Sequence, residues 1–289
     1  MPEQAAGQSA GARRQEGAPD NPKNQVQSVA KAFAVLRAFG PDLPELTVAE
    51  VAVRTGLDRG TAFRLIHTLI GLGYLRAVPD GGRRFRLTLK CLELGFSALA
   101  AGDLPGHATP LLREVVPGVA DAGSLGVLDR GEVVYLARVE AGLERHGVVR
   151  RPGSRIGAYA TALGQAILAW LPRHEQVEHL ESVERVKLSE RTLTELGTLL
   201  ARLAEVRARG YAVSDGENAY GLVTVAAPVL DQHGTPCAGV SLTVGSGRMS
   251  SAAEFAALAA PQAQRLAAEL GEGVRLSLGA IGLPRGAAR

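Results

Sequence analysis

The sequence is poor in cysteine and in aromatic residues. Its 289 residues include two cysteines, two methionines and one tryptophan, and Phe, Trp and Tyr together make up 4%. Cys91 and Cys237 stand far apart, and neither has a metal-ligand spacing around it. This argues against a disulfide framework and a cysteine metal site, and it favours buried, reduced thiols in a cytoplasmic protein.

Long apolar runs are also missing. The longest candidate, residues 163–171, is interrupted by Gly164 and Gln165 and is far too short to cross a bilayer. The N-terminus has no apolar segment of the kind that a secretory signal requires. We therefore expect a cytoplasmic protein with no membrane partner.

Patterns typical of catalysis are absent as well. His174 and His179 are five residues apart on a predicted helix, a rotation of roughly 140°, so they do not share a face as a zinc motif requires. The segment 239–243 lacks the second glycine of a hydrolase elbow. Since the chain also has no phosphate-binding glycine loop and no paired catalytic carboxylates, we expect no enzyme, no catalytic residue, no metal site and no cofactor.

Positive charge is concentrated near the N-terminus. Residues 25–90 hold ten Lys and Arg against five Asp and Glu, whereas residues 91–289 hold 19 against 21. The hydrophobic content of 46% is enough for a substantial core. The basic segment is therefore the part of the chain expected to meet phosphate groups.

Two short helices joined by a glycine turn lie within this basic segment. Thr47 and Glu50 form a capping box, Gly56 supplies a left-handed stop, and Asp58 caps the second helix. The helical period places apolar residues on one face of the second helix and a mixed surface on the other. The apolar face holds Ala62, Leu65, Ile66 and Leu69, and the mixed face holds Arg59, Gly60, Phe63, Arg64 and His67.

A helix before this pair and a hairpin after it predict a winged helix-turn-helix. We expect Val29, Ala32, Phe33 and Leu36 to form the core face of the first helix. Apolar and polar residues alternate along segments 74–78 and 84–88, which flank Asp80-Gly81-Gly82, and this pattern strongly predicts a hairpin. Two interpretations of Phe63 stay open, contact with a thymine methyl or packing under the wing. The arginines at the wing tip, which could reach phosphate or a minor groove, are Arg83, Arg84 and Arg86.

The rest of the chain alternates helices and hairpins. Residues 88–101 predict a linker helix with a stripe of leucines that could pack on a second copy. Beyond Pro105, strands near 124–128, 132–140, 146–150, 222–230 and 236–244 are separated by helices near 111–115, 160–170, 194–209 and 252–270. Antiparallel strand pairs separated by helices predict an α+β domain.

The order of these motifs resembles the IclR family of bacterial transcriptional regulators. The resemblance runs from Val26 to about Leu270, and it implies a GAF-like effector-binding domain behind the winged helix, with assembly as a homodimer or homotetramer. The segment 84–88 with 92–95 is most similar to the branch that regulates aromatic-acid catabolism. The residues that carry the family resemblance are Val26-Gln27-Ser28-Val29-Ala30, Gly56-Leu57-Asp58-Arg59 with Thr61, Gly71-Leu72-Gly73-Tyr74, Tyr159-Ala160-Thr161-Ala162-Leu163-Gly164-Gln165-Ala166, and Gly221 with Ala226-Ala227-Pro228-Val229.

The candidate ligand residues gather around the central helix of the second half. Its start offers backbone donors that suit a carboxylate, and Arg145 and His146 could add charge. The resemblance adds Glu217, Ser241 and Thr243; each candidate is equally well explained as a structural hydrogen-bonding residue. The chain has Gln165 where the family often has Lys or Arg, and Ser241 and Thr243 where it often has Asn and Ser. The residues predicted at the helix start are Tyr159, Thr161, Leu163 and Gly164.

Together these observations predict a one-component regulator that binds a double-stranded DNA operator under the control of a small organic, aromatic acid. A ligand-independent repressor with an oligomerisation domain, and an enzyme or carrier with a DNA-binding module, are the alternatives. The predicted DNA-binding residues are Arg59, Gly60, Thr61, Phe63, Arg64, His67, Arg83, Arg84 and Arg86. The predicted organisation is a flexible tail 1–24, a winged helix-turn-helix 25–87, a linker helix 88–104, an effector-binding domain 105–272 and a C-terminal tail 273–289.

Overall fold

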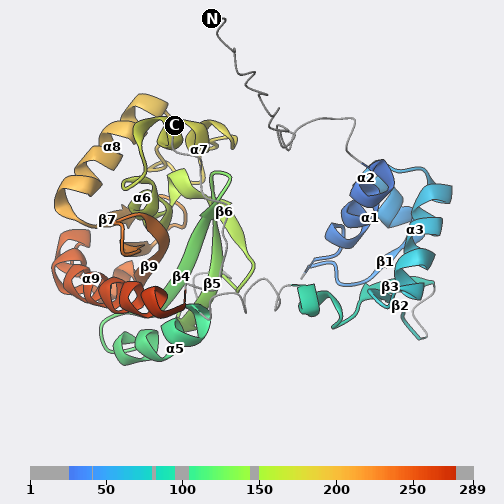
Figure 1. The fold of residues 1–289 in the computed structure, drawn as a ribbon, viewed down its shortest axis with the longest axis horizontal. Coiled ribbons are helices and arrows are strands. Elements are labelled where there is room, and N and C mark those ends of the chain that lie inside the picture. The colour runs from blue at the N-terminus through green and yellow to red at the C-terminus, as the bar shows by residue number, and fades with distance from the viewer. Residues whose placement is uncertain (1–25, 41, 80–82, 95–103, 144–149, 278–289) are drawn as a thin grey trace, which may run out of the picture. The chain divides into compact units, whose positions relative to one another are not determined.

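The computed structural model describes residues 26–40, 42–79, 83–94, 104–143 and 150–277, and the expected N-terminal tail lies outside them. The chain divides into two compact units, Met1–Phe96 and Ser97–Arg289. Figure 1 shows the elements of each unit.

In its described residues, the N-terminal unit contains helices α1, α2 and α3, a further helical segment at residues 91–94, and a small antiparallel sheet in the strand order β1-β3-β2. The β2–β3 hairpin was predicted from the sequence, whereas β1 was not. Leu46 of β1 pairs with Phe85 of β3, so β1 is the third strand of this sheet. The predicted winged helix-turn-helix is confirmed. Its elements are α1 (Gln27–Arg37), β1 (Leu46–Thr47), α2 (Val48–Thr55), α3 (Arg59–Gly71), β2 (Leu75–Ala77) and β3 (Arg84–Leu87).

Local side-chain contacts fix the turn between α2 and α3. The Glu50 N–H donates to the Thr47 hydroxyl, and the Thr47 N–H donates to the Glu50 carboxylate at 2.7 Å, which completes the capping box. Gly56 ends α2 with a φ of 69°, and the Asp58 carboxylate accepts the Thr61 N–H at 2.8 Å at the start of α3. Each cap satisfies donors that a helix start leaves unpaired.

The predicted core face of α1 is wrong at Val29 and Phe33, whereas Leu36 is half-buried and packs against the core as predicted. Val29 and Phe33 are 53% and 46% exposed, whereas Val35, Ala38 and Phe39 are buried with α2, α3 and the sheet. Apolar residues on α1 form more than one stripe at helical spacing, and packing against α3 decides which stripe is buried.

The C-terminal unit is built on a six-stranded antiparallel sheet in the order β6-β5-β4-β9-β8-β7. Helices α5 (Leu104–Val115) and α9 (Ala252–Ser277) cover one face, and α6 (Ala162–Leu168) covers the other (Figure 1). This confirms the predicted α+β class. The strands are β4 (Ala122–Asp129), β5 (Glu132–Glu140), β6 (Arg155–Gly157), β7 (Ala212–Asp215), β8 (Leu222–Leu230) and β9 (Pro236–Gly245).

Each face of this sheet has its own core. Leu125, Val240 and Leu242 pack with α5 and α9, and Tyr135 and Ala226 pack with α6. Helix α8 (Leu196–Arg209) packs against α6, and α7 (Arg173–Glu181) precedes it. The short helices η3 (Ala158–Ala160) and η4 (Ser246–Arg248) precede α6 and α9.

Several boundaries differ from the sequence prediction. Strands β6 and β7 were not predicted, α5 is longer than expected, α6 is shorter, and α9 continues to Ser277, past the domain boundary expected at 272. In the predicted linker helix, residues 91–94 are helical and residues 95–103 lie outside the described part. The strand expected near 146–150 falls almost wholly on residues 144–149, which are also outside it. Among the described helices, none has the length and apolarity needed to cross a membrane.

Candidate DNA-binding and effector sites

The outer face of α3 lies beside a groove that we call the reading groove. Arg59, Phe63, Arg64 and His67 are exposed, and the Phe63 and His67 rings are in contact, with centroids 4.2 Å apart. The groove has a volume of about 830 Å³ and runs between α3, the start of α2 and the wing. It is lined by Thr47, Val48, Ala49, Arg59, Gly60, Phe63, His67, Ala77, Arg83 and Phe85.

The three wing arginines do not share one surface. Arg83 lines the reading groove with a φ of 63°, whereas Arg84 and Arg86 flank Phe85 on β3 and so point to the opposite face of the sheet. Arg84 donates to the Glu45 carbonyl at 3.0 Å and pairs with Glu50 at 3.3 Å. Arg84 therefore fastens the wing to the start of α2.

Arg76 is a further exposed arginine that was not predicted. It lies on β2 directly opposite Arg86, and both side chains are exposed. Like charges across a strand pair repel each other, and Arg86 is paired with the Glu45 carboxylate at 4.0 Å. Thr61 is only partly exposed, and its hydroxyl accepts a hydrogen bond from Arg64 at 3.5 Å.

In the C-terminal unit, the structure brings four of the nine predicted ligand residues to one small cavity, the inner cavity. Its volume is about 20 Å³, room for about one water molecule. The four are Thr161, Leu163, Ser241 and Thr243. The full lining is Ser124, Tyr135, Arg138, Arg150, Thr161, Ala162, Leu163, Asn218, Leu222, Thr224, Ser241 and Thr243.

Hydroxyl groups from three neighbouring strands form one wall of the inner cavity. Ser124 stands opposite Ser241, and Thr224 stands opposite Thr243, with their hydroxyl oxygens 3.0 Å apart. All four residues are on the sheet face that α6 covers. The wall can therefore donate and accept hydrogen bonds.

Arg138 was not predicted, because a β-bulge places it in this cavity. The register of β5 shifts so that Tyr135 pairs with Gly126 and Ala137 with Leu125, which leaves Leu136 as the extra residue. Arg138 then faces Ser124, whose hydroxyl accepts from it at 2.9 Å, although the side chain is only 8% exposed. Strict alternation along β5 would assign Arg138 to the other face of the sheet.

Arg150 and the phenol of Tyr135 line the inner cavity together with Arg138. Arg150 lies 6.0 Å from the centre of the Tyr135 ring, and burial raises the pKa of the Tyr135 phenol. Arg138 also donates to the Glu140 carboxylate at 2.8 Å. Two of the five N–H donors of its guanidinium are used in this way, so its remaining donors can meet a carboxylate.

Tyr159 and Gly164 have structural roles. The Tyr159 hydroxyl donates to the Val186 carbonyl and accepts the Val186 N–H at 2.8 and 3.0 Å. A side chain at Gly164 would come within 2.4 Å of the Ala158 backbone. The Gly164 N–H is taken by the Thr161 hydroxyl at 2.9 Å, so this donor at the start of α6 is occupied.

Glu217 lies behind the inner cavity. Its carboxylate accepts from Gln165 at 3.0 Å and pairs with Arg202 at 3.2 Å, and burial raises the pKa of Glu217. The Gln165 Oε1 atom is buried without a hydrogen-bond partner. Arg145 and His146 lie outside the described residues, and Val240, next to Ser241 on β9, faces α5 and α9.

Comparison with known proteins assigns both units. The model of the IclR helix-turn-helix domain matches residues 28–79, and that of the bacterial transcriptional regulator IclR C-terminal domain matches residues 96–268. The chain is 33% identical to the HTH-type transcriptional regulator KdgR of Escherichia coli strain K12 over 254 residues, which cover 87% of this chain and 95% of that protein.

Two further similarities extend the comparison. The p-hydroxybenzoate hydroxylase transcriptional activator of Acinetobacter baylyi is 34% identical over 223 residues, 76% of this chain and 81% of that protein. An IclR homologue from Microbacterium hydrocarbonoxydans, solved in complex with 4-hydroxybenzoate, has the same fold, with a TM-score of 0.71 at 23% identity over 88% of this chain and 100% of that one. This chain is therefore a member of the IclR family of bacterial transcriptional regulators.

Proposed function

We propose that the chain binds a DNA operator through α3 and the wing, as a homodimer or homotetramer, and that a small aromatic acid in the inner cavity changes this binding. Such coupling requires a difference of only about 1–3 kcal/mol between two states of the protein. The observation that carries the proposed ligand class is a nearly buried arginine, Arg138, beside a wall of hydroxyl groups.

The lining suits each part of a hydroxylated aromatic acid. A carboxylate pairs well with the guanidinium of Arg138, because arginine presents parallel N–H donors. Tyr135 and Leu163 can cover an aromatic ring, and Ser241 and Thr243 can reach a ring hydroxyl. The start of α6 is a weaker anchor for the carboxylate, since the Thr161 hydroxyl already occupies one of its donors.

The relatives support this class of ligand. One regulates p-hydroxybenzoate hydroxylase, and another was solved with 4-hydroxybenzoate. The second candidate function, a regulator that acts without a ligand, is favoured by the inner cavity of about 20 Å³, which is too small for a ring unless it opens.

Thermal unfolding of the full-length protein with added acids tests the proposal. An acid at 100 times its dissociation constant should stabilise the protein by about 2.7 kcal/mol. We expect this from 4-hydroxybenzoate or protocatechuate and not from aliphatic acids of equal charge. Arg138→Met should abolish the stabilisation, because it removes the cation and keeps most of the side-chain volume.

Arg155→Met is the matched control. Arg155 is on β6 of the same sheet, and its partners Asp129 and Glu132 are on the surface. This variant should keep the response to the acid. Stabilisation by aliphatic acids alone would remove the aromatic class, and operator binding that no acid affects would favour the ligand-independent regulator.

A further inference from the structure

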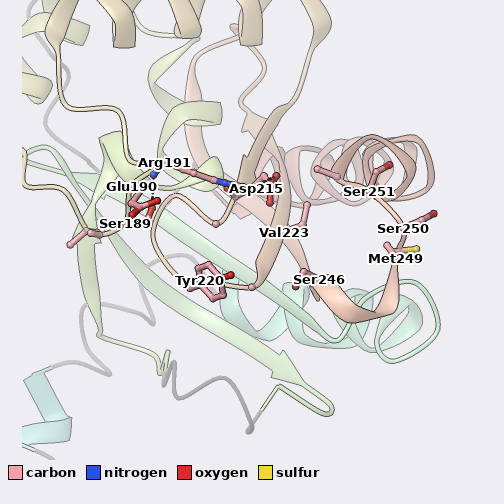
Figure 2. A pocket seen from close by; sticks show the side chains of 14 residues that line it. Ser189, Glu190, Arg191, Asp215, Tyr220, Val223, Ser246, Met249, Ser250 and Ser251 are labelled. Carbon is pink, nitrogen blue, oxygen red and sulfur yellow. Dashed lines mark hydrogen bonds and ion pairs between the residues drawn. The ribbon is translucent and has the colours of Figure 1, made fainter.

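A second, larger cavity lies beside the inner cavity, and we call it the outer cavity. Its volume is about 740 Å³, within the range of pockets that hold small molecules. Figure 2 shows Tyr220 between a segment that carries Ser189 and Arg191 and a segment that carries Met249 and Ser251.

The two cavities share a wall. The connection between β7 and β8, residues 216–221, contributes Tyr220 to the outer cavity and Asn218 to the inner cavity. At the start of β8, Val223 lines the outer cavity while Leu222 lines the inner one, because successive side chains of a strand point to opposite faces. Residues 216–221 therefore close the end of the sheet between the two spaces.

The backbone of this connection begins and ends with glycines in the left-handed region. Gly216 has a φ of 68° and Gly221 a φ of 74°. Glycine visits this region and others at little cost, so the two positions can act as hinges. Tyr220, next to the second hinge, is 92% exposed and has little packing to lose when the segment moves.

Glu217 makes the side-chain polar contacts that hold the segment in place. The Glu217 carboxylate contacts Gln165 of α6 and Arg202 of α8, and the Glu217 carbonyl accepts from the Ser189 and Thr192 hydroxyls at 3.1 and 2.5 Å. Glu217 is only 5% exposed. Ala219 is also buried, in a cluster with Ala122, Leu143 and Leu222, so the segment has two held residues, Glu217 and Ala219, between its two hinges, and Tyr220 is exposed.

We propose that residues 216–221 form a gate, and that an aromatic acid first binds in the outer cavity against Tyr220 and then enters the inner cavity when the gate opens. The inference rests on the proposed effector site, since that site must enlarge to admit a ring. Residues 216–221 are the part of the inner cavity's wall that adjoins the outer cavity, and they have a glycine able to act as a hinge at each end.

Exchange kinetics of a fluorinated probe test the gate. ¹⁹F exchange NMR of 3-fluoro-4-hydroxybenzoate with the full-length protein gives association and dissociation rates. Arg202→Met removes one contact of Glu217 and should raise both rates by the same factor, roughly fivefold for the loss of one partly exposed hydrogen bond. The dissociation constant should stay unchanged, because the gate is closed both before and after binding.

The alternative outcome is equally specific. A faster dissociation with an unchanged association rate would show that Glu217 supports a static wall, and it would overturn the gate. Arg155→Met, the surface variant on β6, should leave both rates unchanged. Tyr220→Ala should slow association roughly threefold, as expected for a lost ring-stacking contact, while Tyr220→Phe restores it; wild-type rates in Tyr220→Ala would overturn entry through the outer cavity.

Hydrogen exchange without any ligand separates this proposal from the proposed function. The Gly216 N–H donates to the Leu222 carbonyl and the Ser246 N–H donates to the Gly221 carbonyl, at 2.8 and 2.7 Å. In Arg202→Met both amides should exchange roughly fivefold faster than in wild type, while central amides of β8 and β9 do not change. Unchanged exchange at Gly216 and Ser246 overturns the gate, whereas failure of the wild-type protein to bind any acid overturns only the effector assignment.

Discussion

Phe63→Ala is the substitution that best separates recognition of DNA from folding of the N-terminal unit. Phe63 is 50% exposed at the reading groove, and its other side contacts His67, which in turn lies 6.3 Å from the centre of the Phe85 ring. About half of the ring surface therefore packs within its own domain, and the other half is exposed and can contact DNA.

The magnitude follows from this division. Burying a whole phenylalanine side chain is worth about 1.5–3 kcal/mol, so each half of the ring accounts for about 1 kcal/mol. Phe63→Ala should then lower the free energy of unfolding by about 1 kcal/mol and weaken DNA binding by a similar amount, roughly fivefold in affinity.

The assay compares two measurements on the same variant. DNA affinity is measured by fluorescence anisotropy at fixed salt, with a duplex that the wild-type protein selects from a random pool, and stability is measured by urea unfolding. Val53→Ala, on α2 at a site that is 83% exposed, is the matched control and should change neither. An unfolding loss above about 3 kcal/mol with unchanged DNA affinity would identify Phe63 as a packing residue and refute the reasoning.

Three further outcomes are expected. Arg84→Met should lower the melting temperature while leaving the salt dependence of DNA binding unchanged, because Arg84 is tied to Glu50; a slope reduced by about one unit would instead reveal a phosphate contact. Burial raises the pKa of Glu217 above 4.5, so its carboxyl contributes stability at low pH that is lost as pH rises through the raised pKa. In urea titrations across this range Glu217→Gln should lack that loss, and a parallel pH dependence in both proteins would contradict it. Gly164→Ala should cost about 1–3 kcal/mol in urea unfolding since its new methyl group meets the Ala158 backbone, whereas Gly71→Ala, with no atom nearby, should be tolerated; equal stability of the two variants would contradict the close approach.

Features fixed by neighbouring residues were predictable from the sequence. The capping box of Thr47 and Glu50, the stop at Gly56 and the bounds of β8 all follow from short-range patterns, and the structure confirms them. The burial of α1 was not predictable in this way. Its apolar residues satisfy more than one helical stripe, and only packing against α3 selects Val35 over Phe33.

The candidate effector site was predictable only in part, for a related reason. Ser241 and Thr243 alternate regularly on β9, so their common face could be anticipated. Tyr159 could not be recognised as structural, because its partner Val186 is 27 residues away in the sequence. Arg138 was missed because a pairing irregularity, invisible in the amino-acid pattern, changes the face to which it points.

The bulge at Leu136 decides which residue of β5 faces the inner cavity. Without it, the pairing of β5 with β4 would advance by one residue, and Ala137 in place of Arg138 would stand opposite Ser124. The cavity wall would then exchange a cation for a methyl group with no change in amino-acid composition. The bulge therefore decides which of two neighbouring residues, Arg138 or Ala137, faces the inner cavity, so a one-residue shift in the pairing of β5 with β4 would change the chemistry of this wall while the residues of β5 stay the same.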